Sequence, residues 1–68
     1  MEVEITKEQK VENKIYFEVT PTEQELKNRF VFGKEVAVDF NDQNQIELER
    51  TKAKEEAKIE FEKLAETT

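Results

Sequence analysis

Reactive side chains are scarce in this chain, which contains no serine, cysteine or histidine. These residue types supply most enzymatic nucleophiles and the commonest general base. Paired carboxylates hydrolyse glycosides, but only where a cleft holds the sugar between them. A chain of 68 residues has little room for such a cleft, and most of its carboxylates occupy positions expected to face solvent. We therefore predict that the protein is not an enzyme and uses no cofactor.

One segment, Asp39–Arg50, partly matches the spacing of a calcium-binding loop, which needs oxygen ligands at positions 1, 3 and 5, glycine at 6 and glutamate at 12. The first three ligand positions hold Asp39, Asn41 and Gln43. The match then fails, because Asn44 stands in place of the glycine and Arg50 in place of the bidentate glutamate. Gly33 is the chain's only glycine, so no glycine-rich phosphate loop is present. The sequence predicts no metal site.

The chain is strongly acidic, with 17 acidic and 11 basic residues and a formal net charge of −6. Binding to nucleic acid or to an anionic membrane relies on clustered lysine and arginine, and the sequence has no basic run. No segment approaches the roughly 18 apolar residues of a membrane-spanning helix, and the first twenty residues lack the apolar run of a secretory signal. The absence of cysteine fits a reducing compartment. These features predict a cytoplasmic protein whose acidity favours solubility or a basic protein partner.

The elements that must position these side chains begin with two alternating segments. Residues 2–6 and residues 14–20 each alternate polar and apolar side chains, which predicts two half-buried strands. In the second segment one face holds Ile15, Phe17 and Val19. Tyr16 points to the opposite face. We expect the strands to pair as a hairpin, with residues 7–13 as a long polar connection.

The next segment carries a helix-start signal. Thr20 and Glu23 match a capping box, and Pro21 fits the first helical position, where its missing N–H costs nothing. Only two apolar side chains follow at helical spacing. The sequence therefore predicts a short helix or turn near residues 21–30.

The stretch from residue 29 to residue 40 contains three of the five phenylalanines together with Gly33. Gly33 either ends the short helix in a left-handed cap or begins a two-residue hairpin turn with Lys34. In both cases a strand follows. The residues expected on the inner face of that strand are Val36, Val38 and Phe40.

Residues 45–50 fit two different structures. Asp42 is a good helix cap, but Ile46 and Leu48 alternate with glutamates as they would in a strand. A helix from Gln43 to Glu66 would be about 36 Å long, whereas a typical strand spans about 17 to 20 Å. Because such a helix would overhang its sheet, we favour a fourth strand at residues 45–50.

From Lys52 onward the sequence predicts a helix, because it is rich in strong helix formers and has neither glycine nor proline. One apolar stripe at helical spacing is formed by Ala53, Ala57, Phe61 and Leu64. The small alanines would let this helix pack closely against the sheet.

Ile59 lies outside that stripe, about 120° or more around the helix from its members. If the helix extends back to residue 45, Leu48 falls on nearly the same line as Ile59, with glutamates beside it. Such a face would bind a partner protein or pair two copies of the chain. The candidate partner-binding residues are Tyr16, Leu48, Glu55, Ile59, Glu62 and Glu66.

These patterns predict one small α+β domain over residues 1–68, with an antiparallel sheet of three to four strands packed against a C-terminal helix. The expected function is that of a non-enzymatic acidic protein-interaction module, which inhibits or regulates a basic or nucleic-acid-handling protein by charge mimicry. The alternative is a structural or assembly protein that self-associates into a homo-oligomer through its C-terminal helix. A core this small usually needs added stabilisation, which the binding of another protein or self-association would supply.

Overall fold

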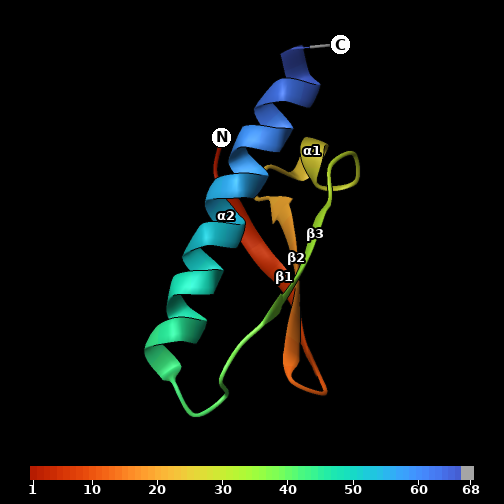
Figure 1. The fold of residues 1–68 in the computed structure, drawn as a ribbon. Coiled ribbons are helices and arrows are strands. Elements are labelled where there is room, and N and C mark those ends of the chain that lie inside the picture. Colours follow the sequence, from red (N-terminus) through yellow and green to blue (C-terminus); the bar gives the residue numbers. More distant parts are fainter. Residues whose placement is uncertain (67–68) are drawn as a thin grey trace.

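The protein has two layers, a three-stranded antiparallel sheet and a long helix packed across one face of it (Figure 1), in a computed structural model that describes residues 1–66. The elements in chain order are β1 (Val3–Val11), β2 (Lys14–Pro21), α1 (Gln24–Lys27), β3 (Phe32–Ala37) and α2 (Gln43–Glu66). The central strand is β2, so β1 and β3 are both edge strands. The predicted α+β class, with an antiparallel sheet against a C-terminal helix, is confirmed, and the sheet has three strands among the described residues.

A tight hairpin joins β1 and β2. Their register pairs Val11 with Lys14, which leaves only Glu12 and Asn13 in the loop. Glu12 adopts φ 58°, in the left-handed region that non-glycine residues seldom occupy. The predicted long connection over residues 7–13 is therefore wrong. Residues 7–11 form the second half of β1, and they are mostly polar because an edge strand with exposed side chains needs no apolar alternation.

A bulge in β1 decides which of its side chains face the helix. The register shifts between Ile5 and Lys7, so that Ile5 pairs with Val19 whereas Glu8 pairs with Phe17. Val19 and Phe17 are both fully buried on the helix side of β2. Directly opposite residues share a face, so Glu8 points toward the helix and Lys7 points away from it.

The core lies between β2 and α2. Its buried apolar residues are Ile15, Phe17, Val19, Val38, Ile46, Ala53, Ala57 and Phe61. Phe61 also stacks on Phe30, with ring centroids 5.6 Å apart. The predicted stripe is confirmed for three of its four members. Leu64 lies on the same side of α2, but it is 41% exposed because the last turns of α2 project beyond the sheet (Figure 1).

Gly33 lies inside β3, so neither of its two predicted roles is correct. It pairs with Glu18 in the sheet, and its φ is not positive. A Cβ atom at this position would meet the Tyr16 hydroxyl at 2.6 Å and two Tyr16 ring atoms at 3.2 Å. Gly33 therefore makes room for the Tyr16 ring rather than for a turn. The inner-face residues predicted beyond it do pack on the core, with Val38 buried and Val36 and Phe40 partly buried.

The short helix α1 is a single turn, and the predicted capping box does not form. Thr20 and Pro21 end β2, and the N-cap is Glu23, which makes no side-chain cap bond. The backbone N–H of Thr22 donates to the Glu2 carbonyl at 3.0 Å. Pairing with the N-terminal segment thus keeps Pro21 and Thr22 extended, whereas the capping-box pattern predicted that the helix begins at Pro21.

The long helix α2 begins at Gln43, so the predicted fourth strand at residues 45–50 is wrong. The Asp42 carboxylate accepts a hydrogen bond from the Gln45 backbone N–H at 3.2 Å, and the Gln45 side chain accepts one from the Asp39 N–H at 3.1 Å. A helix of about 36 Å does overhang the sheet, since its last turns project beyond the strands, but the nine residues of β1 span about 30 Å and leave most of α2 covered.

Candidate functional site

The face of α2 that points away from the sheet carries a continuous line of exposed side chains, termed here the outer line. Its members are Leu48, Lys52, Glu55, Ile59, Glu62 and Glu66. At 100° per residue, the outer line lies roughly 180° around the helix from the buried stripe. Within residues 1–66 no other element covers this face (Figure 1).

Two aliphatic side chains give the outer line its apolar content. Leu48 is 52% exposed and Ile59 is 55% exposed. They are eleven residues apart, which is three helical turns, so they lie within about 20° of each other around the helix axis. The structure therefore places them on one face, as predicted for a helix that extends back to residue 45.

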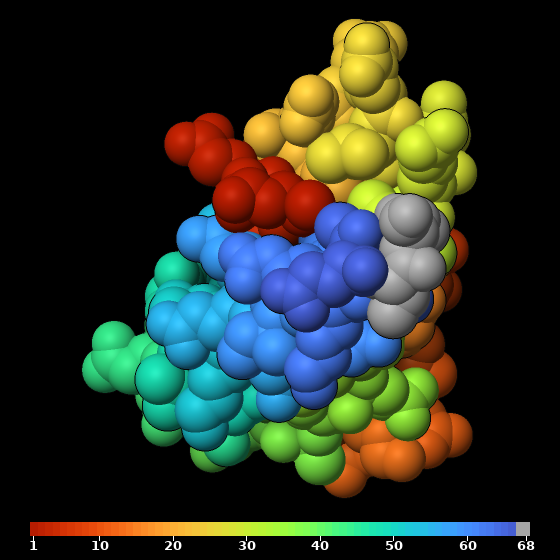
Figure 2. Space-filling model, turned by 90° about the horizontal axis from the view of Figure 1, so that it is seen from above, coloured from red at the N-terminus to blue at the C-terminus, as the bar shows by residue number. Residues whose placement is uncertain are grey.

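The outer line also carries three carboxylates. Glu55, Glu62 and Glu66 are exposed and form no ion pair with any described residue. By contrast, Glu56 on the flank of α2 pairs with Lys34 of β3 at 2.6 Å. Figure 2 shows the molecule from above. In this view the last turns of α2 (blue) are exposed at the surface, beside the N-terminal residues (red).

Tyr16, the remaining candidate, is not brought together with the outer line. It lies on the far face of the sheet, half-buried, beside Gly33. Its hydroxyl donates to the Glu18 carboxylate at 3.0 Å. This hydrogen bond raises the pKa of Tyr16, because the carboxylate favours the protonated phenol, and partial burial acts in the same direction.

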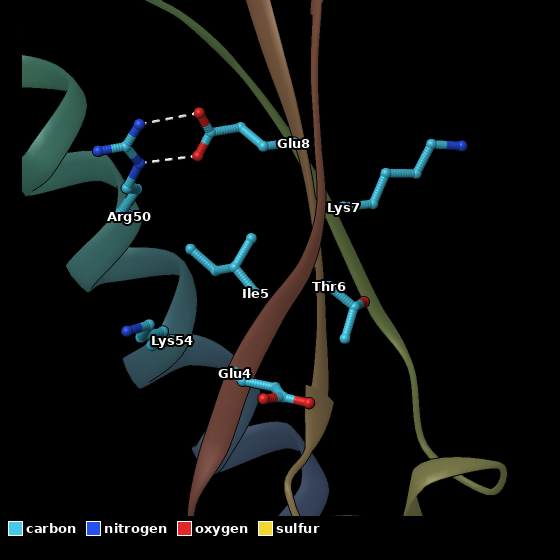
Figure 3. A pocket seen from close by; sticks show the side chains of 7 residues that line it. All are labelled: Glu4, Ile5, Thr6, Lys7, Glu8, Arg50 and Lys54. Carbon is cyan, nitrogen blue, oxygen red and sulfur yellow. Dashed lines mark hydrogen bonds and ion pairs between the residues drawn. The ribbon is translucent and has the colours of Figure 1, made fainter.

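A pocket of about 530 Å³ lies between β1 and α2 (Figure 3). Its lining residues are Glu4, Ile5, Thr6, Lys7, Glu8, Arg50 and Lys54. In Figure 3 Ile5 and Glu8 point toward the helix, and Lys7 points away from it. Sequence reasoning missed this pocket because its two walls are far apart in the chain, and because the bulge that turns Glu8 inward has no local signal.

The polar centre of the pocket is a bidentate ion pair. The Arg50 Nε and Nη2 atoms donate to the two Glu8 carboxylate oxygens at 2.7 and 2.9 Å, and Nη1 donates to Glu47. The hydrogen bond with Arg50 is the main reason that the pKa of Glu8 is lowered, and the pKa of Arg50 is raised in return. Each group holds the other in its charged form. We therefore expect this pair to hold α2 against β1 rather than to transfer protons near neutral pH.

The described residues contain no group of three or more histidine, cysteine or acidic side chains arranged to hold a metal ion. None of the helices in residues 1–66 is both long enough and apolar enough to cross a membrane. Comparison with protein-family models finds no matching family, and comparisons with curated proteins and with solved structures find no match.

Proposed function

We propose that this protein is a non-enzymatic, acidic protein-interaction module that binds a basic protein through the outer line of α2. The observation that carries the proposal is one uncovered helix face that holds two exposed aliphatic side chains and three carboxylates without an ion pair among residues 1–66. Protein interfaces commonly combine an apolar centre with a polar rim, and this face offers both. The net charge of −6 also favours approach by a positively charged partner.

The side-chain inventory supports binding rather than catalysis. The chain has no serine, cysteine or histidine to act as a nucleophile or as a neutral-pH base. The Glu8 carboxylate, which lines the pocket, is already bonded by Arg50. A carboxylate held in its charged form by a guanidinium is a poor proton donor near neutral pH.

The partner expected is a protein that normally binds a polyanion. Glu62 and Glu66 lie one turn apart at the exposed end of α2, so they present two carboxylates to basic side chains that would otherwise bind phosphates. Such binding would make the chain an inhibitor or regulator of a nucleic-acid-handling protein by charge mimicry. The absence of cysteine fits the cytoplasm as the place of action.

The test captures partners from a host lysate on the immobilised chain at about 50 mM and about 500 mM salt, and then measures the affinity of the protein retained at low salt. Replacing Glu62 and Glu66 together with glutamine should weaken that affinity by about tenfold, because each rim charge contributes up to about 1 kcal/mol. The matched control replaces Glu12 and Glu25 with glutamine, which changes the net charge equally at sites away from the outer line.

The control variant should bind as the unmodified chain does. Equal losses in the two double variants would contradict the proposal, since they would show that net charge rather than this surface matters. Capture that is as strong at high salt as at low salt would contradict the charge-based recognition.

A further inference from the structure

The carboxylates of the outer line are spaced too widely to imitate duplex DNA. Along the helix axis Glu55, Glu62 and Glu66 span about 17 Å. Over that length a duplex carries about ten negative charges and a single strand about five. The outer line also holds Lys52, which pairs with Glu49 at 3.7 Å. A site that binds duplexes would therefore meet only about a third of the charge that it normally binds, whereas a site for single strands would meet more than half.

The outer line presents apolar groups together with its charges. Leu48 and Ile59 are both more than half exposed, and Ile59 lies between Glu55 and Glu62 along the line. Single-stranded nucleic acid likewise exposes the flat faces of its bases beside its phosphates, whereas a duplex hides those faces in its stack. Proteins that bind single strands accordingly combine a basic groove with aromatic side chains that contact the bases. The outer line offers both kinds of group that such a groove binds.

We propose that the partner of the outer line is a protein that binds single-stranded nucleic acid in a basic groove lined with aromatic side chains. This inference rests on the proposed function, because it specifies which kind of basic protein the outer line binds. The carboxylates of Glu55, Glu62 and Glu66 take the place of phosphates at lysine and arginine side chains of the groove. Leu48 and Ile59 take the place of bases against its aromatic rings.

The shape of α2 suits a groove. The sheet lies behind the helix, and the last turns of α2 project beyond the strands (Figure 1). The ridge from Leu48 to Glu66 is about 27 Å long, and an α-helix with its side chains is about 10 to 12 Å across. Docking of one exposed helix face in a groove is a common mode of protein recognition. The expected contact is therefore a convex helix in a concave basic site.

Competition with oligonucleotides tests the proposal. The immobilised chain is loaded from a host lysate at about 50 mM salt, and the protein followed is the one whose retention is lost with Glu62→Gln/Glu66→Gln. A single-stranded oligonucleotide of about 30 nucleotides, or the duplex of the same sequence at the same phosphate concentration, is then added. The single strand should displace the retained protein at a concentration at least about tenfold lower than the duplex requires.

Substitutions of the two aliphatic side chains test the apolar part of the contact. Leu48→Gln and Ile59→Gln leave the net charge unchanged, and glutamine is a good helix former. Each should weaken the affinity of the retained protein at least about fivefold, because each removes apolar area that the groove buries. The matched control is Val31→Gln, which replaces a side chain that is 64% exposed but lies off the outer line, between α1 and β3. It should change the affinity less than about twofold.

Three results would overturn the assignment to single strands. The first is displacement by the duplex at a concentration equal to or lower than the single strand requires, which would indicate a duplex-binding partner. The second is displacement by neither oligonucleotide, which would indicate a basic protein that does not bind nucleic acid at this site. The third is an unchanged affinity in both glutamine variants of Leu48 and Ile59, with the fold of each checked by circular dichroism, which would show that charge alone holds the partner.

The same experiment separates this proposal from the proposed function. A retained protein that depends on Glu62 and Glu66 but meets any of those three results leaves the binding of a basic protein standing and removes only the single-strand assignment. A lysate from which no protein is retained through Glu62 and Glu66 would overturn both proposals. Displacement by the single strand together with weakened binding of the Leu48 and Ile59 variants is the result that supports the assignment.

Discussion

Ile46 and Leu48 distinguish the observed helix from the strand that the local sequence pattern favours. In α2 these residues lie about 200° apart around the helix axis. Ile46 is 2% exposed beneath the sheet, whereas Leu48 is 52% exposed on the outer line. In a strand, residues two positions apart share one face and are buried to a similar extent. Replacing each residue with alanine should therefore cause very unequal losses of unfolding free energy.

The magnitudes follow from burial. Ile46→Ala removes three buried carbons at about 0.8 kcal/mol each and leaves a cavity, so we expect a loss of about 3 kcal/mol. Leu48→Ala removes the same number of carbons from a side chain that is already half in solvent. Alanine is also a slightly better helix former than leucine, which offsets part of the cost. We expect the Leu48 variant to lose less than about 1 kcal/mol.

Urea unfolding followed by circular dichroism measures both losses. With a slope of about 1 kcal/mol per molar urea, the Ile46 variant should unfold at a midpoint about 3 M lower, and the Leu48 variant at a midpoint less than about 1 M lower. A chain of this length has about 3 to 10 kcal/mol of stability in total, so Ile46→Val serves where alanine unfolds it. Equal losses at the two positions would refute the assignment of residues 45–50 to α2.

Three further predictions concern the sheet. Thr20→Val should raise the unfolding free energy by about 1 kcal/mol, because the buried Thr20 hydroxyl has no hydrogen-bond partner among the described residues, and a lower melting temperature would contradict this. Gly33→Ala should lower the unfolding free energy by about 1 to 2 kcal/mol, because its Cβ would clash with Tyr16. The same change in a Tyr16→Val background should cost less, and an equal cost would exclude the clash as the cause. Since Arg50 lowers the pKa of Glu8, the stability from this pair is present above the ordinary glutamate pKa and is lost as the pH falls through the lowered value. Glu8→Gln should remove that part of the acid dependence in unfolding measured as a function of pH, and an unchanged dependence would contradict the assignment.

Strong periodicity made much of the fold predictable. The alternation in residues 14–20 identified the central strand, and its three inner residues are fully buried. The helix formers after Lys52 identified most of α2, together with three residues of its buried stripe. These segments are predictable because each buries one complete face, so burial imposes its period on the sequence.

Other parts were mispredicted because non-local contacts override local signals. Thr20 and Pro21 carry helix-start chemistry, but pairing with β1 keeps them in a strand. Residues 7–11 look like a loop, yet pairing with β2 makes them the second half of β1. Residues 45–50 alternate as a strand does, but they pair with neither edge strand, and the Asp42 cap starts a helix instead. Whether such a segment becomes a strand depends on whether another strand pairs with it, and the local sequence pattern does not contain that information.

The candidate surface was predictable for the same reason as the helix. The sequence places Leu48 and Ile59 on one line whenever the helix includes both residues, and the structure shows that it does. The pocket was not predictable, because a one-residue bulge decides whether Lys7 or Glu8 faces α2. Such a bulge changes the face of every following residue without leaving a mark in composition or periodicity.

The charged side chains on the two sheet edges bear on where a partner can bind. Glu8 on β1 points inward to Arg50, and Lys34 on β3 points inward to Glu56. Exposed ion pairs of this kind contribute at most about 1 kcal/mol each, so their main effect is on specificity rather than stability. The edge-strand charges are opposite, so α2 must present Arg50 to Glu8 and Glu56 to Lys34. These two contacts favour one rotation of α2 about its axis, because a different rotation would separate one or both ion pairs. Inward-pointing charges on edge strands also oppose the addition of further strands. Strand addition is therefore disfavoured at both edges, and the outer line of α2 is the surface through which we expect this chain to bind a partner.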